Sequence, residues 1–223
     1  MIQSCCTIQA TGTPLPYPAS EAMPDLIIGS EGTGAGQFLF ATDVAVAPNG
    51  DIYVGDRTRL DIQRFDAAGT YLETIGKPAS GGLLAPGTFS RIVGIAVDGD
   101  GRLYVADDDL QQIERLESDG AWSVVQLPRR DNRINGLAVD GEGNIFVSQI
   151  DYIAGSFWIY GPDGAPIAQV GSLGNGLGQF DGPSGIGLDG QGNAYVADWA
   201  IGRIQKFELD YEQIDAAAED TGG

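Results

Sequence analysis

An internal repeat constrains the fold of this chain more than any other feature. Four segments of the 223-residue sequence align without gaps, at residues 43–56, 94–107, 136–149 and 185–198. The same glycine recurs in each segment, and these four glycines lie 51, 42 and 49 residues apart. Because a repeated sequence encodes a repeated unit of structure, we expect four similar modules that each pack against their neighbours.

Each repeated segment predicts a β-hairpin. Apolar runs such as Val44–Val46 and Ile52–Val54 flank Asn-Gly, Asp-Gly, Glu-Gly or Gln-Gly pairs, which supply the positive φ of a tight turn. A third strand is expected after each hairpin, at 62–65, 112–116, 157–160 and 203–207. A fourth follows the first three units, at 71–75, 122–126 and 167–170. Four short strands every 40–50 residues or so are typical of propeller blades.

The last unit lacks a fourth strand, and the N-terminal region contains an unassigned one. Leu26–Gly29 is followed nine residues after Gly29 by Phe38, as Val170–Gly171 is followed by Phe180. We therefore expect Leu26–Ile28 to be the outer strand of the last blade, which would close a small ring of four four-stranded blades and hide its edges. The alternative is an arc of a larger propeller that needs further chain or a second copy of this chain.

These motifs resemble the NHL repeat family of β-propellers. The resemblance rests on Gly-Gln-Phe-x-x-Pro-x-Gly-Ile at 178–186, the Val/Leu-Asp-x-x-Gly-x-x-Tyr-Val-Ala-Asp core of the second and fourth units, and Arg203–Phe207, and it covers residues 26–207. Asp43 replaces the family's glycine in the first unit, and Gln149 replaces the last aspartate in the third. The resemblance implies an all-β propeller, usually of six blades, so the ring size stays open. It also implies a pairing of Asp198 with Arg203.

The ends of the chain differ from the repeats in composition. Residues 1–24 are rich in proline and predict an extended arm, 25–208 form the propeller, and 209–223 form an acidic tail with a short helix at 211–219. The chain has neither a signal peptide nor an apolar run that could span a membrane, so we expect a soluble protein without membrane insertion. The compartment stays open, and is extracytoplasmic if an upstream anchor has been lost. Cys5 and Cys6 are adjacent in the sequence, so a disulfide between them could not cross-link distant parts of the fold.

Charge and composition exclude several functions. With 31 acidic and 12 basic residues the net charge is −19, which disfavours nucleic acid and anionic membranes as partners. The chain has no histidine, which removes histidine acid–base catalysis and histidine-ligated zinc. We expect no cofactor. Asp107, Asp108 and Asp109 are the best candidates for a metal site, although a solvated loop explains them as well.

The innermost strands are expected to begin facing the central channel. These positions hold one carboxylate and three glycines, which is not a metal cage: Asp43, Gly94, Gly136 and Gly185. Glycine at such positions lets neighbouring backbones approach closely.

The strand directions place three kinds of connection at one end of the propeller, which we call the loop face: the starts of first strands, the loops between second and third strands, and the loops between blades. Arginine together with exposed aromatics is typical of protein-binding surfaces. The predicted partner-binding residues on this face are Phe40, Arg57, Arg59, Arg91, Arg130, Arg133, Tyr152 and Trp199. We therefore expect a non-enzymatic scaffold for a protein or peptide of acidic character, with self-association if the ring is incomplete. The alternative is a metal-dependent hydrolase or lactonase of the propeller kind.

Overall fold

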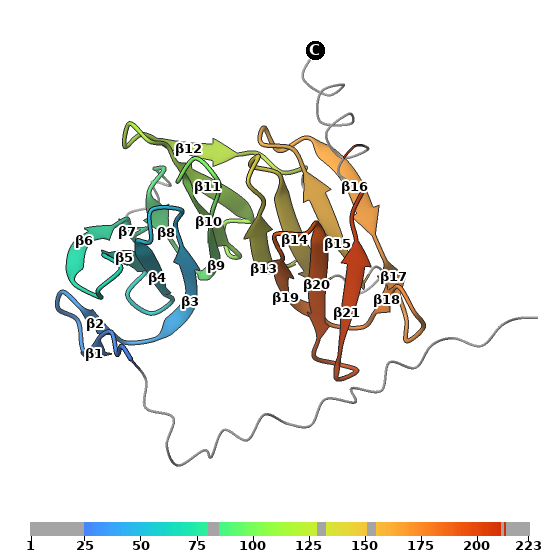
Figure 1. Ribbon diagram of the computed structural model, residues 1–223, viewed down its shortest axis with the longest axis horizontal. Helices are drawn as coiled ribbons and strands as arrows, with labels where there is room; N and C mark the ends of the chain where they lie inside the picture. Colours follow the sequence, from blue (N-terminus) through green and yellow to red (C-terminus); the bar gives the residue numbers. More distant parts are fainter. Residues whose placement is uncertain (1–24, 80–84, 129–132, 151–154, 211, 213–223) are drawn as a thin grey trace, which may run out of the picture.

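The computed structural model describes residues 25–79, 85–128, 133–150, 155–210 and 212. Its main elements are four antiparallel sheets arranged as the blades of a β-propeller (Figure 1). Blade 1 contains β3 (Ala41–Val46), β4 (Ile52–Asp56), β5 (Asp61–Phe65) and β6 (Tyr71–Ile75). Blade 2 contains β9 (Ile92–Val97), β10 (Leu103–Asp107), β11 (Gln112–Leu116) and β12 (Trp122–Val125). Blade 3 contains β13 (Arg133–Val139), β14 (Ile145–Ile150), β15 (Gly155–Tyr160) and β16 (Pro166–Val170). Blade 4 contains β19 (Pro183–Leu188), β20 (Asn193–Asp198) and β21 (Arg203–Glu208).

The predicted hairpins and their glycine turns are confirmed. The first and second strands pair in antiparallel register in all four blades, with the turn between them at the repeated glycine. That glycine has a φ of 88° at Gly50, 81° at Gly101, 91° at Gly143 and 83° at Gly192. Residues with a Cβ rarely adopt this region, which explains why glycine recurs at this position.

Neighbouring blades pack face to face through three apolar clusters. The cluster between blades 1 and 2 is built around Ile62, Ile92, Ile95, Leu103 and Val105. The cluster between blades 2 and 3 is built around Ile113, Ile134, Leu137, Ile145 and Val147. The cluster between blades 3 and 4 is built around Phe157, Ile159, Phe180, Ala194 and Val196. Each junction therefore buries two sheet faces, and this burial holds the successive blades together.

In the described residues, three short parallel ribbons lie in the segments that lead into blades 1, 2 and 4. They are β1–β2 (Ser30–Glu31 with Gln37–Phe38), β7–β8 (Lys77–Pro78 with Thr88–Phe89) and β17–β18 (Ser172–Leu173 with Gln179–Phe180). Each ribbon places a phenylalanine over a glycine, and a Cβ on Gly171 would lie 2.6 Å from the Phe180 ring. The spacing between glycine and phenylalanine seen in the sequence therefore reflects this close packing.

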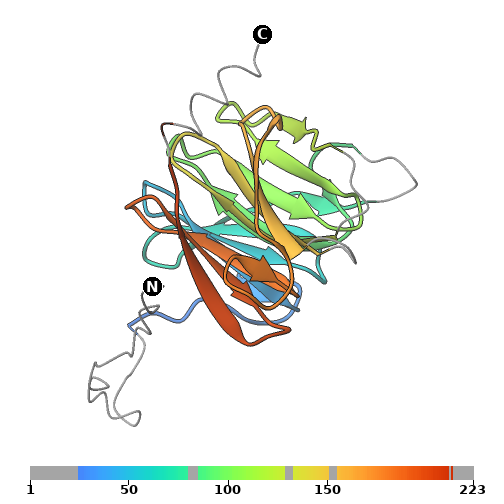
Figure 2. The same cartoon turned by 90° about the vertical axis from the view of Figure 1, so that its right-hand side faces the viewer.

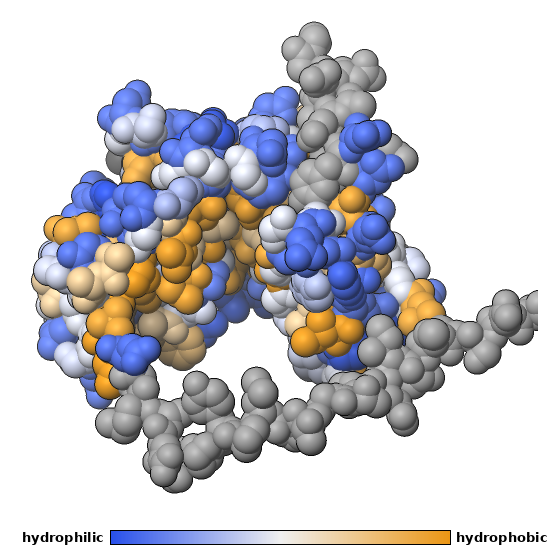
Figure 3. All heavy atoms as spheres, viewed as in Figure 1, coloured by the Kyte–Doolittle hydropathy of each residue, from blue (hydrophilic) through white to orange (hydrophobic). Residues whose placement is uncertain are grey.

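The expected closure of the ring by Leu26–Ile28 is wrong in the described structure. Residues 26–29 form no strand, and the side chains of Leu26 and Ile28 lie against Gly69 in the turn between β5 and β6. Among the described residues blade 4 has three strands, and no strand pairs with the outer edge of β21. The four blades form an arc with an opening between blade 1 and blade 4 (Figures 1 and 3). Figure 2 turns the arc so that blade 4, in orange and red, faces the viewer.

The predicted arm at 1–24 lies outside the described residues. So does the predicted C-terminal helix, apart from residue 212. No helix in the described part of the chain is long and apolar enough to cross a membrane.

Candidate functional site

An aspartate at the end of the second strand organises the loop face in blades 1, 2 and 4. The Asp107 carboxylate accepts hydrogen bonds from the backbone N–H groups of Ser90 (2.6 Å), Arg91 (3.1 Å) and Leu110 (3.0 Å). Asp56 accepts four such bonds in blade 1, and Asp198 accepts bonds from the N–H groups of Asp181 and Gly182. Burial raises the pKa of Asp56, but these N–H donors outweigh burial and the net pKa is lowered. The repeated aspartate is therefore a clamp that ties two loops of one blade together.

The expected pairing of Asp198 with Arg203 is wrong, because each side chain has other partners. Arg203 donates to the carbonyl oxygens of Asn175 (2.8 Å), Gly176 (2.5 Å) and Gln179 (2.6 Å). It thereby fixes the loop that leads from blade 3 into blade 4.

Arg59 does the same work in blade 1. Its guanidinium donates to the carbonyl oxygens of Gly34 (2.8 Å) and Gln37 (3.0 Å), and it pairs with the Asp61 carboxylate at 2.8 Å. The side chain is mostly buried, and the hydrogen bonds to Asp61 raise its pKa. Arg59 was expected on a partner-binding surface, but its donors serve the protein's own loops.

Arg57 and Phe40 form an exposed pair on the loop face of blade 1. The Arg57 guanidinium carbon lies 4.8 Å from the centre of the Phe40 ring, the geometry of a cation–π contact. The backbone N–H of Arg57 also donates to the carbonyl oxygen of Phe40, which fixes the two loops relative to each other. Both side chains are exposed. The structure thus places these two residues side by side and open to solvent.

Arg91 and Arg133 meet at one buried carboxylate. Asp108 Oδ2 lies 3.6 Å from a guanidinium nitrogen of Arg91 and 2.8 Å from one of Arg133. Asp108 Oδ1 accepts a hydrogen bond from the backbone N–H of Ile134, so this aspartate joins the loops of blades 2 and 3. Both arginines keep part of their side chains in solvent, and Asp109 lies 3.9 Å from Arg91.

The three aspartates proposed for a metal do not converge. Asp107 binds backbone N–H groups, Asp108 binds the two arginines, and Asp109 is half-exposed beside Arg91. The described residues contain no group of three or more histidine, cysteine, aspartate or glutamate side chains placed to hold a metal ion.

The remaining predicted residues do not join these clusters. Trp199 is exposed at the far end of the arc, in a depression that it shares with Ser184, Ala197 and Ile204 of blade 4. Arg130 and Tyr152 lie outside the described residues. The structure therefore brings together two pairs of the predicted set, Arg57 with Phe40 and Arg91 with Arg133.

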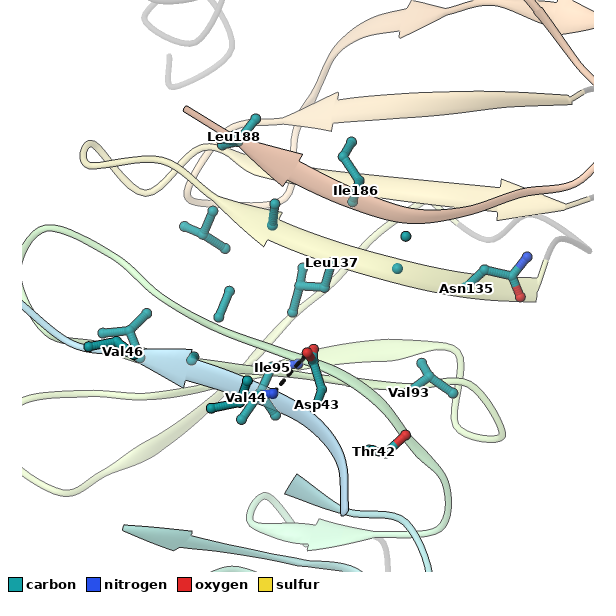
Figure 4. A pocket seen from close by; sticks show the side chains of 17 residues that line it. Thr42, Asp43, Val44, Val46, Val93, Ile95, Asn135, Leu137, Ile186 and Leu188 are labelled. Carbon is teal, nitrogen blue, oxygen red and sulfur yellow. Dashed lines mark hydrogen bonds between the residues drawn. The ribbon is translucent and has the colours of Figure 1, made fainter. Parts of the chain in front are cut away.

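A groove of about 470 Å³ runs along the propeller axis (Figure 4). The innermost strands of all four blades line it, mostly with apolar side chains such as Val44, Ile95, Leu137 and Ile186. Asp43 is its one carboxylate and accepts hydrogen bonds from the backbone N–H groups of Ile95 (2.8 Å) and Val44 (2.9 Å). Burial raises the pKa of Asp43, and those hydrogen bonds offset only part of the rise.

The sequence placed Asp43 at the channel but did not reveal that mostly apolar side chains from all four blades would surround it. The alternating Val and Ile residues of the first strands were the available signal. As expected, glycine in these strands permits close approach, because a Cβ on Gly136 would collide with the carbonyl oxygen of Ser184 in blade 4.

The fold and this axial groove define the chain as a β-propeller. No protein-family model matches the chain, and no curated protein matches its sequence. Solved structures match in fold. A virginiamycin B lyase from Staphylococcus aureus is 17% identical with a TM-score of 0.50, over 78% of this chain and 57% of the lyase chain. A putative exported protein from Bacteroides fragilis is 15% identical with a TM-score of 0.57, over 77% and 48%.

A third similar structure is the hydrazine synthase of Kuenenia stuttgartiensis, which is 9% identical with a TM-score of 0.57, over 88% of this chain and 50% of that one. The present chain thus spans about half the length of the solved chains that it matches. Identities this low establish the shared fold and nothing finer.

Proposed function

We propose that this protein is a non-enzymatic, NHL-like binding propeller whose loop face takes an acidic segment of a protein or peptide. The observation that carries the proposal is the Arg57–Phe40 pair, a cation held over an aromatic ring with both side chains exposed to solvent. The planar arginine guanidinium group can bind a carboxylate through two parallel hydrogen bonds. An aromatic ring supplies apolar contact area at small entropic cost.

Arg91 and Arg133 supply a second subsite on blades 2 and 3. Their shared partner Asp108 is buried and hydrogen-bonded, so it orients the two guanidinium groups from the protein side of the loop face. A ligand carboxylate arriving from solvent would bind the part of the Arg91 guanidinium that stays exposed. The nearby Asp109 offsets some of the positive field, so the attraction is moderate and local.

The hydrolase alternative has less support. One similar solved structure is a virginiamycin B lyase described as catalytically inactive after a histidine-to-alanine change, with quinupristin bound. The present chain has no histidine that could take such a role. The axial groove contributes a single carboxylate, Asp43, and this group is engaged by two backbone N–H donors. General acid–base or metal chemistry needs partners that the described groove does not supply.

The test is a titration with fluorescein-labelled peptides that alternate glutamate with apolar residues, followed by fluorescence anisotropy. We expect the double variant Arg57→Ala/Phe40→Ala to weaken binding about tenfold or more, as the loss of an interface anchor does. The matched control is Asp100→Ala/Glu142→Ala, which changes two exposed residues at the opposite end of the blades and should leave binding unchanged. Equal affinity of both double variants for the peptides would reject this function.

A further inference from the structure

The outward face of blade 4 is one half of an interface that the chain builds three times internally. In the third strands, Ile62, Ile113 and Phe157 are each 0% exposed because the next blade covers them. Ile204 occupies the same register position in β21, opposite Ala197 as Ile113 is opposite Ala106, and is 71% exposed.

The same contrast between covered and exposed positions is seen in the second strands and at the glycines of the first strands. Tyr104 and Phe146 are fully buried, whereas the equivalent Tyr195 is 38% exposed. A Cβ on Gly94 would touch Leu137 of the next blade, whereas one on Gly185 would meet nothing within 4 Å. Blade 4 therefore has the same outward surface on which blades 1, 2 and 3 each pack the next blade. In the described structure no further blade packs on it.

Blade 1 presents the other half of the interface. Ile95 and Leu137, which face the preceding blade, are 3% and 6% exposed, and the equivalent Val44 is 59% exposed. Val46 on the same strand is also exposed. Val44 and Val46 thus form an exposed apolar strip on β3, and Figure 3 shows orange, apolar surface on the blade 1 side of the opening. Large exposed apolar strips of this kind mark interaction surfaces.

An unpaired segment lies against the turn between β5 and β6 of blade 1. In blade 3, the turn glycine Gly164 is covered by Val125 and Gln126, at the end of the last strand of the preceding blade. In blade 1, the equivalent Gly69 is covered in the same way by Leu26 and Ile28. Leu26–Ile28 therefore occupies the position of a fourth strand belonging to a preceding blade, while blade 4 has no fourth strand among the described residues.

We propose that two copies of this chain close one propeller ring. Blade 4 of each copy packs on blade 1 of the other around a two-fold axis, and Leu26–Ile28 of each copy adds to β21 of its partner as the missing fourth strand. The register follows from the other blades: Ile28 would lie opposite Ile204, as Ile75 lies opposite Ile62 and Val170 opposite Phe157. This pairing leaves no open sheet edge at either junction.

Three observations favour a second copy as the occupant. The junction would continue an interface already present three times within the chain. Because this chain covers 48% to 57% of the similar solved chains, two copies supply about one whole propeller of that size. The axial groove, now open on one side, would become an enclosed channel lined by both copies.

Charges at the new junction are complementary, although each whole chain is acidic. Arg115 donates to the carbonyl oxygen of Pro162 across the junction between blades 2 and 3. Lys206 takes the position of Arg115 in blade 4, and the corresponding turn of blade 1 begins with Asp66. Two chains of −19 repel each other at long range, so moderate salt should strengthen this association. Acidic peptides would respond to salt in the opposite sense, so the two proposals can fail separately.

The first test is the mass in solution, by light scattering coupled to size exclusion. We expect twice the chain mass of 23.3 kDa for the wild-type protein, and one chain mass for Val44→Lys and for Ile204→Glu. A mixture of these two variants should recover the dimer, because a mixed pair has one wild-type junction and one junction with a lysine–glutamate pair. That recovery also shows that the variants are folded. Leu177→Lys, at an exposed leucine away from both faces, is the control and should stay dimeric.

The second test is a cross-link. In a Cys5→Ser/Cys6→Ser background, Leu26→Cys and Lys206→Cys should form a disulfide between copies, seen as a covalent dimer on a non-reducing gel. A disulfide within one chain would mean that a single chain closes its own ring, and would overturn the proposal. A wild-type mass of one chain at all concentrations, or a mass that keeps rising with concentration as in an open polymer, would also overturn it.

Discussion

The three internal junctions and the two open faces of the arc are built from the same repeated residues, yet their environments differ completely. Ile113 between blades 2 and 3 is fully buried, and Ile204 at the same register position is mostly exposed. The difference arises from the neighbouring blade and not from the residue type, since both are isoleucines in the third strand of a blade. In a repeat protein, a position is buried only where the next repeat is present.

Ionisable groups show the same contrast. Asp140 in blade 3 and Asp189 in blade 4 begin equivalent turns, and each accepts hydrogen bonds from the asparagine four residues later. Burial raises the pKa of Asp140 despite those bonds. At Asp189 some desolvation also raises the pKa, but hydrogen bonds from Asn193, Gln191 and Tyr195 outweigh it and lower the pKa to about 2. The two equivalent carboxyl groups thus differ in pKa because Asp140 is more deeply buried and because Asp189 has an additional donor in the Tyr195 hydroxyl group.

The largest expected effect comes from truncating the two isoleucines. Ile113→Ala should cost about 4 kcal/mol of unfolding free energy, since it opens a cavity between two blades. Ile204→Ala should cost less than about 1 kcal/mol when the protein is dilute and monomeric, since an exposed side chain leaves no cavity. Urea denaturation followed by tryptophan fluorescence measures both. Equal costs would mean that the face of blade 4 is covered within one chain.

Removing the aspartate clamps tests whether blade 4 is internally complete. Asp107→Ala and Asp198→Ala each leave buried backbone N–H groups without an acceptor, and each should cost about 3 kcal/mol. The costs should be similar because both carboxylates are buried within their own blade. Thermal unfolding measures them, with the half-exposed Asp109→Ala as a control that should unfold like the wild type. A much smaller cost at Asp198 would show that blade 4 is loosely folded.

Adding a methyl group to the innermost strands probes the junctions from the axis. Gly136→Ala places a Cβ against the Ser184 carbonyl oxygen and should cost about 2 kcal/mol through overpacking. Gly185→Ala meets no atom within 4 Å and should leave the monomer unaffected. Chemical denaturation compares the two. A stable Gly136→Ala protein would contradict the close approach of blades 3 and 4.

The smallest expected effect is on pH dependence. The lowered pKa of Asp189 stabilises the fold above the unfolded value near 4, and this contribution is lost as pH falls through about 2. The raised pKa of Asp140 has the opposite sign, because its contribution is present below the unfolded value and is lost as pH rises through the folded one. An NMR titration of the two carboxyl carbons should order them as Asp189 below Asp140. The reverse order would contradict the difference in burial.

The sequence determined the repeated part of this fold well. Turn glycines such as Gly143, with its positive φ, and the strands on either side could be predicted because the restraint is local and recurs four times. The position of Leu26–Ile28 was predicted only in part. Its spacing to Phe38 matches that of Val170 to Phe180, but residues 26–29 form no strand in the described structure, because spacing carries no information on which blade, or which chain, would supply a pairing partner.

The candidate site was less predictable for a similar reason. The sequence placed Arg57, Arg59 and Arg91 on one face from the strand directions, but arginines on a loop can serve either a ligand or the protein's own carbonyl groups. Arg59 serves the carbonyl oxygens of Gly34 and Gln37, and nothing in its local sequence distinguishes it from Arg57. Only the three-dimensional contacts separate the structural arginine from the exposed one.

Amide hydrogen exchange of β21 tests most directly whether the two open faces meet. The comparison is between the wild-type protein and Val44→Glu, which carries its change in blade 1, at the other end of the arc. If the outer face of blade 4 is covered by blade 1 of a second copy, β21 should be protected in the wild type and exchange rapidly in the variant, while β11 stays protected in both. Unchanged protection of β21 in the variant would contradict this arrangement.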